Sequence, residues 1–482
     1  MDVIFIKVIQ MKQRTKITAI LIVFITLASI VAIYSYTNSN STELFVIDKN
    51  IKVDGKNVSV NTIEQSDGTW GYYATIGDEF NVTVKNKLEE PIVLHWHGLL
   101  LPNKDDGTEL TQEYIKPNNS YSYKFKLNQS GTFWMHSHYG FQEQTYVEAP
   151  LIIYPKNYNN KNDIVVMFQD FSFKKPEKIM SDLKHNDNSN DHMHHMHKGD
   201  MDMKPNMQMD LNDVEYDDFL TNYKTDDNPE IKTVIPGQTY RLRFINGSAS
   251  TNFWINLGDL KGKVIAVDGV DVKPYQSNIF QLAIAQRMDI EVTIPKAGTF
   301  PILGQVEGQK KQTGIILTTD KNNKDLIVSK EASTNLGAFN YKQLEMLHPK
   351  KDSIKLDNIE KTIDLKLTGN MKDYVWKINN QTWPNVTPIE LKYGKTYLFE
   401  IDNETEMSHP IHIHGHDFKV VKINGKSIDD GVIRDTLYVE PKSSVTIALK
   451  ANELGKWFIH CHMLYHMHSG MMTFIETKRT NV

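Results

Sequence analysis

Hydrophobic and polar residues alternate in short runs along most of the chain after Glu43. Such runs occur at 80–84, 121–127, 240–245, 397–401 and 444–449, with Gly, Pro, Asn and Asp between them. Alternation with a period of two is typical of strands that bury one face, and the intervening residues favour turns. Many short strands separated by turns predict an all-β protein built from sandwiches or barrels.

The N-terminal segment follows a different pattern. Lys12, Arg14 and Lys16 precede an uncharged, strongly apolar run at 17–36. A basic flank before an apolar span of this length is typical of a signal peptide or a membrane anchor, and the basic flank stays in the cytoplasm. We therefore interpret residues 1–39 as such a segment and expect everything that follows to be exported. No clear Ala-x-Ala pattern ends the run and no cysteine lies there to accept a lipid, which favours an uncleaved anchor, although cleavage stays open.

The exported part contains three copies of one sequence pattern. Each copy has an apolar-x-apolar-x-Asn unit, and these units end at Asn86, Asn246 and Asn403. The residues nine and eleven positions after each Asn are His95 and His97, Ile255 and Leu257, and His412 and His414. A second unit starts at Gly131, Gly298 and Gly455, and the residues five and seven positions on are His136 and His138, Leu303 and Gln305, and His460 and His462. The repeat indicates one module in three copies, which we place at 43–155, 160–322 and 355–482.

Only the first and third modules carry histidines at the repeated positions. Because alternate side chains of a strand share a face, each His-x-His pair directs two imidazoles to one side. A single histidine is more often an ordinary core or surface residue, but eight in the same register predict a metal site. We expect the four pairs to converge between the first and third modules, with the middle module as a spacer that carries no metal ligands.

Composition narrows the choice of protein class. The chain has 482 residues, 40% of them hydrophobic and 23% charged, with a formal net charge of −5. These values fit a folded, soluble protein of roughly three domains and exclude a disordered or polytopic membrane protein. The slightly acidic balance argues against a nucleic acid as partner. The single cysteine, Cys461, excludes an intrachain disulfide, a Cys-rich zinc site and a cysteine-ligated iron–sulfur cluster.

The third module adds the ligands of a second kind of metal site. In His460-Cys461-His462 the two imidazoles face one way and the thiolate faces the other. Cys461 can combine with His409 and His466 into a two-His, one-Cys set, and Met471 can supply a weak axial thioether. This is the ligand set of a blue copper centre, and soft sulfur ligands select copper over harder divalent ions.

Together these motifs resemble those of the bacterial multicopper oxidases, over nearly the whole exported chain. The motifs are His95-Trp96-His97-Gly98, His136-Ser137-His138, the 409–415 segment, and the 460–466 segment with Met471. The resemblance implies three consecutive cupredoxin domains of Greek-key β-sandwich type, four copper ions, and O₂ as the electron acceptor that becomes water. It implies a type 1 copper held by His409, Cys461, His466 and Met471, a type 2 copper held by His95 and His412, and a type 3 pair held by His97, His136, His138, His414, His460 and His462.

The resemblance also implies carboxylates that deliver protons. Asp106, eleven residues after His95, matches the acidic residue that relatives place beside the type 2 copper, and we expect it to be catalytic. The alternative is an ordinary turn residue in Asp106-Gly107. Several bacterial relatives carry a second acidic residue directly after the last type 1 histidine, where this chain has Met467. The second proton route is therefore without an assigned residue.

A Met- and His-rich loop interrupts the second module within 185–210. Its candidate ligands are His192, Met193, His194, His195, Met196, His197, Met201, Met203, Met207 and Met209. The stretch is too polar and irregular to form a core, and thioethers with imidazoles suit Cu(I). It resembles the Met-rich segments of copper-tolerance oxidases, although those lie in the third domain. Glu404, Glu406 and Met407, close to His409, form a second candidate docking site for substrate copper, with a plain solvated loop as the alternative.

These features predict an exported monomeric oxidase that converts Cu(I) to Cu(II) and reduces O₂ to water, serving copper tolerance. Nucleic acid is not a partner, and contact with a membrane is limited to the N-terminal segment. A laccase-like oxidase of phenols or amines, or an Fe(II) oxidase, is the alternative within the enzymes. A copper-sequestering protein is the non-enzymatic alternative, but sequestration would not need ten histidines, one cysteine and one methionine in this arrangement.

Overall fold

The computed structural model describes residues 41–185, 211–323 and 325–479, so the predicted N-terminal segment and the Met- and His-rich loop lie outside the described residues. The regular secondary structure of the described chain is almost entirely strand and folds into six sheets that form three pairs, as the alternation predicted. The runs singled out in the sequence fall in strands β4, β6, β12, β23 and β29. Within the described ranges, no helix has the length and apolarity needed to cross a membrane.

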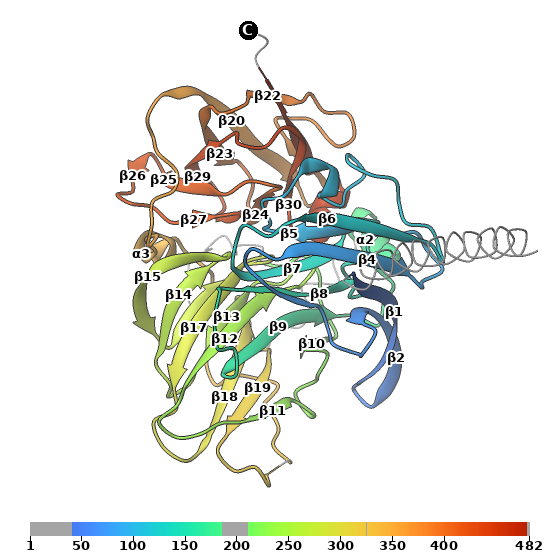
Figure 1. The fold of residues 1–482 in the computed structure, drawn as a ribbon, viewed down its shortest axis with the longest axis vertical. Coiled ribbons are helices and arrows are strands. Elements are labelled where there is room, and N and C mark those ends of the chain that lie inside the picture. Colours follow the sequence, from blue (N-terminus) through green and yellow to red (C-terminus); the bar gives the residue numbers. More distant parts are fainter. Residues whose placement is uncertain (1–40, 186–210, 324, 480–482) are drawn as a thin grey trace, which may run out of the picture.

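The first sheet pair comes from the N-terminal third of the described chain (blue to teal in Figure 1). One sheet has the order β2-β1-β4-β6, made of β1 (Thr42–Val53), β2 (Lys56–Gln65), β4 (Glu79–Asn86) and β6 (Ser120–Lys126). The other has the order β3-β8-β7-β5, made of β3 (Tyr72–Thr75), β5 (Leu94–His97), β7 (Gly131–Ser137) and β8 (Glu148–Tyr154). The short helix η1 (Asn103–Asp105) follows β5.

The second sheet pair has two larger sheets (green to yellow in Figure 1). The order β10-β9-β12-β17-β14-β15 joins β9 (Asp163–Phe171), β10 (Asp218–Thr221), β12 (Thr239–Asn246), β14 (Gly262–Val267), β15 (Val270–Ser277) and β17 (Arg287–Thr293). The order β11-β19-β18-β13-β16 joins β11 (Glu230–Thr233), β13 (Phe253–Asn256), β16 (Ile279–Leu282), β18 (Thr299–Val306) and β19 (Gln312–Thr318). Helices α2 (Pro176–Lys184) and α3 (Lys342–Met346) lie in connections of this part of the chain.

The third sheet pair is formed by the C-terminal part (orange to red in Figure 1). The order β21-β20-β23-β29-β25-β26 joins β20 (Ile359–Asn370), β21 (Val375–Ile378), β23 (Thr396–Asn403), β25 (Phe418–Ile423), β26 (Lys426–Ser427) and β29 (Ser443–Lys450), and β27 (Ile433–Arg434) pairs with β25. The order β22-β31-β30-β24-β28 joins β22 (Ile389–Lys392), β24 (His409–Ile413), β28 (Thr436–Val439), β30 (Gly455–Cys461) and β31 (Met472–Lys478). Helix α4 (Leu464–His468) follows β30.

The repeated asparagines have the same structural role in all three sheet pairs. Asn86, Asn246 and Asn403 end β4, β12 and β23, and each is at most 1% exposed. Each side-chain NH₂ donates to at least two backbone carbonyl groups, and each side-chain oxygen accepts from the backbone N–H two residues later. A buried amide can satisfy several backbone groups at once, which fixes the turn that leads to the next strand.

Buried arginines join the three sheet pairs at their common boundary through hydrogen bonds and ion pairs. Arg287 of β17 donates through Nε to the carbonyl of Thr132 in β7, at 3.2 Å, and through Nη1 to Oδ1 of Asp435 in the third sheet pair, at 2.7 Å. Arg434 of β27 donates to Asp268 of the second sheet pair at 2.7 Å. The second sheet pair therefore bonds to both of the others and fixes their relative position. The sequence pattern predicted only a spacer role for it.

Candidate metal centre

The eight histidines of the four His-x-His pairs gather between the first and third sheet pairs. His95 and His136 are cross-strand partners in β5 and β7, and His412 and His460 are partners in β24 and β30. Across the boundary the ring centroids of His97 and His412 are 3.7 Å apart, and those of His95 and His414 are 3.8 Å apart. All eight side chains are buried. The convergence expected from the repeat is therefore present in the structure.

The hydrogen bond made by one nitrogen of an imidazole ring determines which nitrogen is left to bind a metal. Nδ1 of His95 donates to the carbonyl of Asp106, and Nδ1 of His412 donates to the carbonyl of Asp435, both at 2.9 Å. Donation through Nδ1 leaves Nε2 as the nitrogen with the lone pair. These two Nε2 atoms, with those of His136, His138 and His462 and Nδ1 of His97, are buried and have no hydrogen-bond partner among the described residues.

Such buried nitrogens point to bound metal. An unsatisfied buried polar atom is costly, and a metal ion removes that cost. Nε2 of His414 and Nε2 of His460 also lie only 3.1 Å apart, facing each other. Ligand nitrogens lie within 4.8 Å of one another in the groups His95/His412/His414, His95/His97/His136 and His138/His414/His460. An all-imidazole set of this size fits copper well.

The electrostatics favour the neutral form of six of the eight imidazoles. Burial lowers the pKa of His136 to about 4, with opposition from Glu143, and lowers the pKa values of His97, His138, His412, His414 and His460 well below the ordinary value. Neighbouring imidazoles add to the effect, because each would repel a proton on the next. Neutral imidazole is the form that binds metal.

Asp106 lies against two of the histidines. Its Oδ1 is 3.3 Å from Nδ1 of His95, and its Oδ2 is 3.0 Å from Nδ1 of His414, so one carboxylate contacts a histidine from each side of the boundary. The following residue is Gly107 at φ +74°, where a Cβ would lie 1.6 Å from the carbonyl oxygen of Leu94. Glycine is required there, because the turn has to approach β5 closely enough to bring Asp106 into contact.

Glu143 is a contact that the sequence reasoning missed. It is 2% exposed, and its carboxylate lies 3.1 Å from Nδ1 of His136 and 3.4 Å from Nδ1 of His462. Burial opposes ionisation of this carboxyl, but His462 and His136 outweigh burial and lower its pKa to about 2. Each of the two carboxylates, Asp106 and Glu143, thus contacts one histidine of the first sheet pair and one of the third, and they share none of them. The polar run Gln142-Glu143-Gln144, which begins four residues after His138, was the signal available in the sequence.

A second group, in the third sheet pair, contains the cysteine. Sγ of Cys461 is 3.6 Å from Nδ1 of His409 and 3.9 Å from Nδ1 of His466, and the two Nδ1 atoms are 3.2 Å apart. All three side chains are fully buried, and burial raises the pKa of the Cys461 thiol. Met471 is also buried, and its carbonyl accepts the backbone N–H of Cys461 at 3.0 Å. One thiol with two imidazole nitrogens in a triangle fits a copper ion, which would bind the thiol as thiolate.

Two residues of other elements hold His466 in place. The indole of Trp376 stacks on its ring with 4.1 Å between centroids. Nε2 of His466 is 3.2 Å from Oδ2 of Asp213, which also accepts a hydrogen bond from the hydroxyl of Tyr374. Asp213, fully buried here, was not among the sequence candidates, because nothing local distinguishes it from the other acidic residues that follow the Met- and His-rich loop.

The residues proposed for docking copper next to His409 do not meet on one surface. Glu404 is paired with Lys366 at 3.2 Å and Glu406 with Lys442 at 2.9 Å, both largely exposed, whereas Met407 is 1% exposed. The ten candidate ligands from His192 to Met209 lie outside the described residues. Docking of copper by either group stays a prediction.

Comparisons with known proteins bear on the whole described chain. Models of three domain families, each described as multicopper oxidase, match residues 46–158, 162–323 and 358–481. The chain is 30% identical over 411 residues to the multicopper oxidase MmcO of Mycobacterium tuberculosis, covering 84% of this chain and 80% of that protein. It is 28% identical to a copper resistance protein A homolog of Pseudomonas syringae pv. tomato, over 83% of this chain and 86% of that protein.

The fold is also found among solved structures. Fet3p, described as a multicopper oxidase that functions in iron import, superposes with a TM-score of 0.75 and 19% sequence identity. The match covers 91% of this chain and 90% of Fet3p. At this identity the likeness concerns the fold, which is that of cupredoxin domains.

Proposed function

Because the chain belongs to the multicopper oxidases, which are copper-dependent oxidoreductases that use O₂, we propose that its donor is Cu(I). The balanced reaction is four Cu(I), one O₂ and four protons giving four Cu(II) and two water molecules. We propose that this reaction serves copper tolerance, since Cu(II) crosses membranes less readily than Cu(I). A match to a copper resistance protein supports the proposal.

We assign the copper ligands as the motifs imply. His409, Cys461, His466 and axial Met471 would hold the type 1 copper; His95 and His412 the type 2 copper; and His97, His136, His138, His414, His460 and His462 the type 3 pair. The orphaned ring nitrogens and the thiol triangle support this assignment. When bound, the copper ions supply one-electron transfer between the donor and O₂.

The remaining tasks belong to the chain. Cys461 connects the two groups of ligands, because the residue before it in β30 is His460 and the residue after it is His462. The backbone around Cys461 therefore gives a continuous covalent connection between the thiol and the histidine cluster. Burial of every ligand excludes bulk water, and Asp106 orients two imidazoles through their Nδ1 atoms.

Asp106 is proposed to deliver protons as well. Its Oδ1 is buried, forms no hydrogen bond with the described residues and lies 3.3 Å from Nδ1 of His95, so an acid–base group stands at the edge of the cluster. Glu143 lies on another side of the cluster, where its lowered pKa keeps it ionised, so it accepts hydrogen bonds from His136 and His462 and supplies no proton. The second proton route stays without an assigned residue. The two carboxylates contact four of the eight cluster histidines between them.

The surroundings of His466 support Cu(I) as the donor over a phenol. Its ring is fully buried under Trp376, and its free edge faces the carboxylate of Asp213 instead of an apolar cleft. A bulky phenol needs apolar surface next to this ring, whereas a metal ion needs a carboxylate or another ligand near it. The Met- and His-rich loop, which lies just before Asp213 in the sequence, supplies further Cu(I) ligands. Export is proposed from the basic and apolar N-terminal pattern.

The test is steady-state O₂ consumption by the copper-loaded chain with Cu(I), Fe(II) or a phenol as donor. A second series uses the chain without residues 191–209. Fast turnover of Cu(I) that falls on deletion, with phenol turnover unchanged or higher, is the expected result. Phenol turnover far above Cu(I) turnover, unaffected by the deletion, would make the protein a laccase-like oxidase, and preferential turnover of Fe(II) would make it an Fe(II) oxidase.

A further inference from the structure

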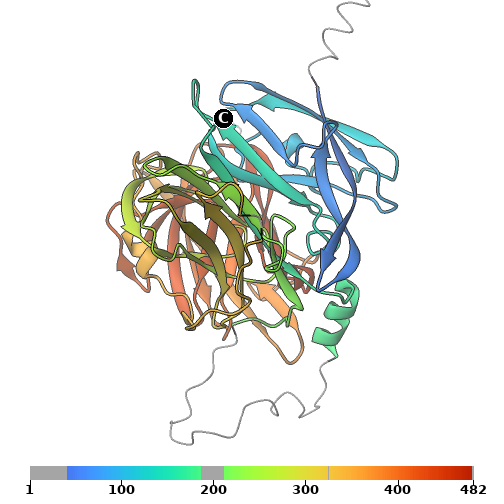
Figure 2. The same ribbon diagram turned by 90° about the horizontal axis from the view of Figure 1, so that it is seen from below.

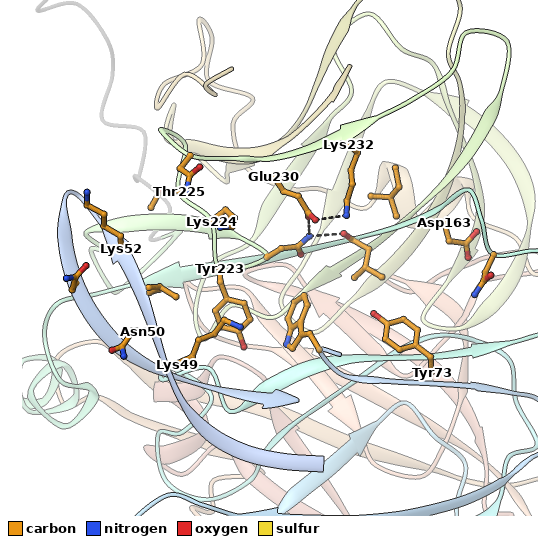
Figure 3. A pocket seen from close by; sticks show the side chains of 18 of the residues that line it. Lys49, Asn50, Lys52, Tyr73, Asp163, Tyr223, Lys224, Thr225, Glu230 and Lys232 are labelled. Carbon is orange, nitrogen blue, oxygen red and sulfur yellow. Dashed lines mark hydrogen bonds and ion pairs between the residues drawn. The ribbon is translucent and has the colours of Figure 1, made fainter. Parts of the chain in front are cut away.

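A cleft of about 700 Å³ lies outside the metal centre, between the first and second sheet pairs. The β1–β2 hairpin forms one wall, and residues 222–232 of the second sheet pair face it (Figure 3). Residues 160–165, at the start of β9, and the aromatic residues Trp70, Tyr73 and Tyr154 complete the lining. None of these residues belongs to the candidate metal centre.

Aromatic rings provide flat apolar surface in this cleft. Trp70 and Tyr223 meet edge to face with 5.2 Å between their centroids, and Tyr73 and Tyr154 lie nearly parallel at 6.5 Å. The indole N–H of Trp70 donates to the carbonyl of Glu148 at 3.4 Å, which fixes the ring plane. Tyr73 is 36% exposed, so part of its ring is open to a ligand. The CH-rich faces of sugar rings pack well on such aromatic faces.

The charges not already neutralised in the cleft are positive. Glu230 pairs with Lys232 at 2.6 Å, and Asp163 accepts from Nε of Arg243 at 2.7 Å. Lys52 and Lys224 line the cleft, are exposed, and form no ion pair with any residue of the described ranges. Two unpaired cations in one cleft, on a chain with a net charge of −5, favour an anionic ligand.

Unused amide groups line the same space. The side chains of Asn50, Asn57, Asn160 and Asn228 make no hydrogen bond within the part of the chain that the structure describes. Each amide offers two donor hydrogens and an acceptor oxygen, a combination that matches hydroxyl groups, which also donate and accept. Asn222 differs, because its amide already bonds to Val165 and Glu230.

The cleft is elongated and has fixed walls. Its labelled side chains extend from Lys52 and Asn50 at one end to Tyr73 and Asp163 at the other (Figure 3). The hairpin is held against the second sheet pair, because Val53 and Val60 pack with Phe171, Leu220 and Tyr223 in one buried cluster. Figure 2 shows the hairpin extending along the side of the molecule. A long open groove with rigid walls suits a stretch of polymer.

We propose that this cleft binds an extended anionic polysaccharide. Aromatic faces would pack against sugar rings, the free amides would bind hydroxyl groups, and Lys52 and Lys224 would pair with the acidic groups. A nucleic acid carries one phosphate per nucleotide and would need a denser basic surface. An acidic peptide without rings would leave the aromatic faces and the amides unused. The site acts independently of copper oxidation.

Binding is measured with the copper-loaded full chain in detergent, against three polymers. These are polygalacturonate, neutral dextran and poly-glutamate, which separate an anionic sugar polymer from a neutral one and from a polyanion without rings. The double variant Lys52→Glu/Lys224→Glu removes the cations, and Tyr73→Ala removes an exposed ring. The control Lys116→Glu/Lys426→Glu makes the same change in net charge at exposed lysines outside the cleft. O₂ consumption with Cu(I) reports folding of each variant.

The chain should prefer polygalacturonate to both other polymers and should bind it more tightly at low salt. The double cleft variant should weaken this binding about tenfold and the control pair far less, because each exposed ion pair contributes modestly. Tyr73→Ala should weaken it about threefold at unchanged net charge. Equal binding of poly-glutamate or dextran, equal losses in the cleft and control pairs, or no binding of polygalacturonate would each overturn the proposal.

Discussion

Replacement of Glu143 by glutamine tests whether the histidine cluster depends on the carboxylate that contacts both sides of it. Both Nδ1 atoms that face Glu143 must carry hydrogen if the Nε2 atoms of His136 and His462 are to bind metal. A carboxylate accepts from both, whereas an amide offers one oxygen and turns its NH₂ group toward the other donor. Glu143→Gln therefore loses at least one hydrogen bond to a charged group.

The structure sets the size of the effect. The carboxylate is buried and lies 3.1 and 3.4 Å from the two imidazole nitrogens. A hydrogen bond to a charged group contributes about 2 kcal/mol, which corresponds to copper binding weakened about thirtyfold. The loss should concern the copper ions held by His136 and His462, while the copper at Cys461 and its visible absorption are retained. Glu143→Ala should lose more, because it removes both contacts.

Copper affinity is measured by competition with a chelator, and EPR with visible absorption separates the sites. Glu148→Gln is the matched control. Glu148 is fully buried in β8, where it is the cross-strand partner of His136; it accepts from Gln169 at 2.7 Å, forms no ion pair with an imidazole of the described chain, and has a pKa raised by burial. Unchanged copper affinity in Glu143→Gln, or equal losses in the two variants, would refute the role given to this carboxylate.

Four further predictions follow from the same geometry. Cys461→Ser should remove the intense visible absorption and about one copper per chain, measured by absorption and metal analysis, because serine gives no thiolate. Asp106→Asn should retain copper, because the amide oxygen can still accept from Nδ1 of His414 and Nδ1 of His95 keeps its bond to the backbone carbonyl of residue 106. It should slow O₂ consumption about tenfold to a hundredfold and change its pH profile, since the amide cannot deliver a proton. Asp213→Asn should shift the reduction potential of the copper at His466 and raise the KM for Cu(I) more than that for a phenol. In the copper-free protein, burial lowers the pKa of His136 to about 4; unfolding free energy should therefore be highest above pH 6.5 and fall by about 2 kcal/mol at pH 5 from this residue alone, as urea titrations would show.

Each of these predictions has an outcome that contradicts it. Retained visible absorption in Cys461→Ser would mean that the chromophore lies elsewhere. An unchanged pH profile in Asp106→Asn would leave that residue with a positioning role only. Equal changes of KM for both donors in Asp213→Asn would remove the link to Cu(I), and a copper-free protein equally stable at pH 5 and 7.5 would mean that His136 is not buried as a neutral ring.

Local sequence patterns were sufficient for the strands and for the convergence of the histidines. Alternation and the repeated asparagines are properties of short segments, and the positions of His95 and His412 in equivalent places followed from counting along the repeat. The multicopper oxidase family and the cupredoxin fold expected from the motifs are confirmed by the family matches.

Local sequence patterns could not identify the residues that form contacts across the boundaries between sheet pairs. Glu143 reaches His462 across 319 positions of sequence, and Arg287 reaches Asp435 and Thr132 together. Such contacts depend on how whole sheets are placed, which no short pattern records. Asp106 was found only because it lies at a known interval from a histidine, and Asp213 has no such marker.

The position of the metal ligands along the chain also determines the order of events in biosynthesis. His95 lies near the start of the described chain and His462 near its end, so no fragment lacking either part contains the complete cluster. The ribosome must finish nearly the whole chain before the cluster can exist at all. If the chain is translocated unfolded, it crosses the membrane without copper, and the metal supply outside determines when the enzyme becomes active.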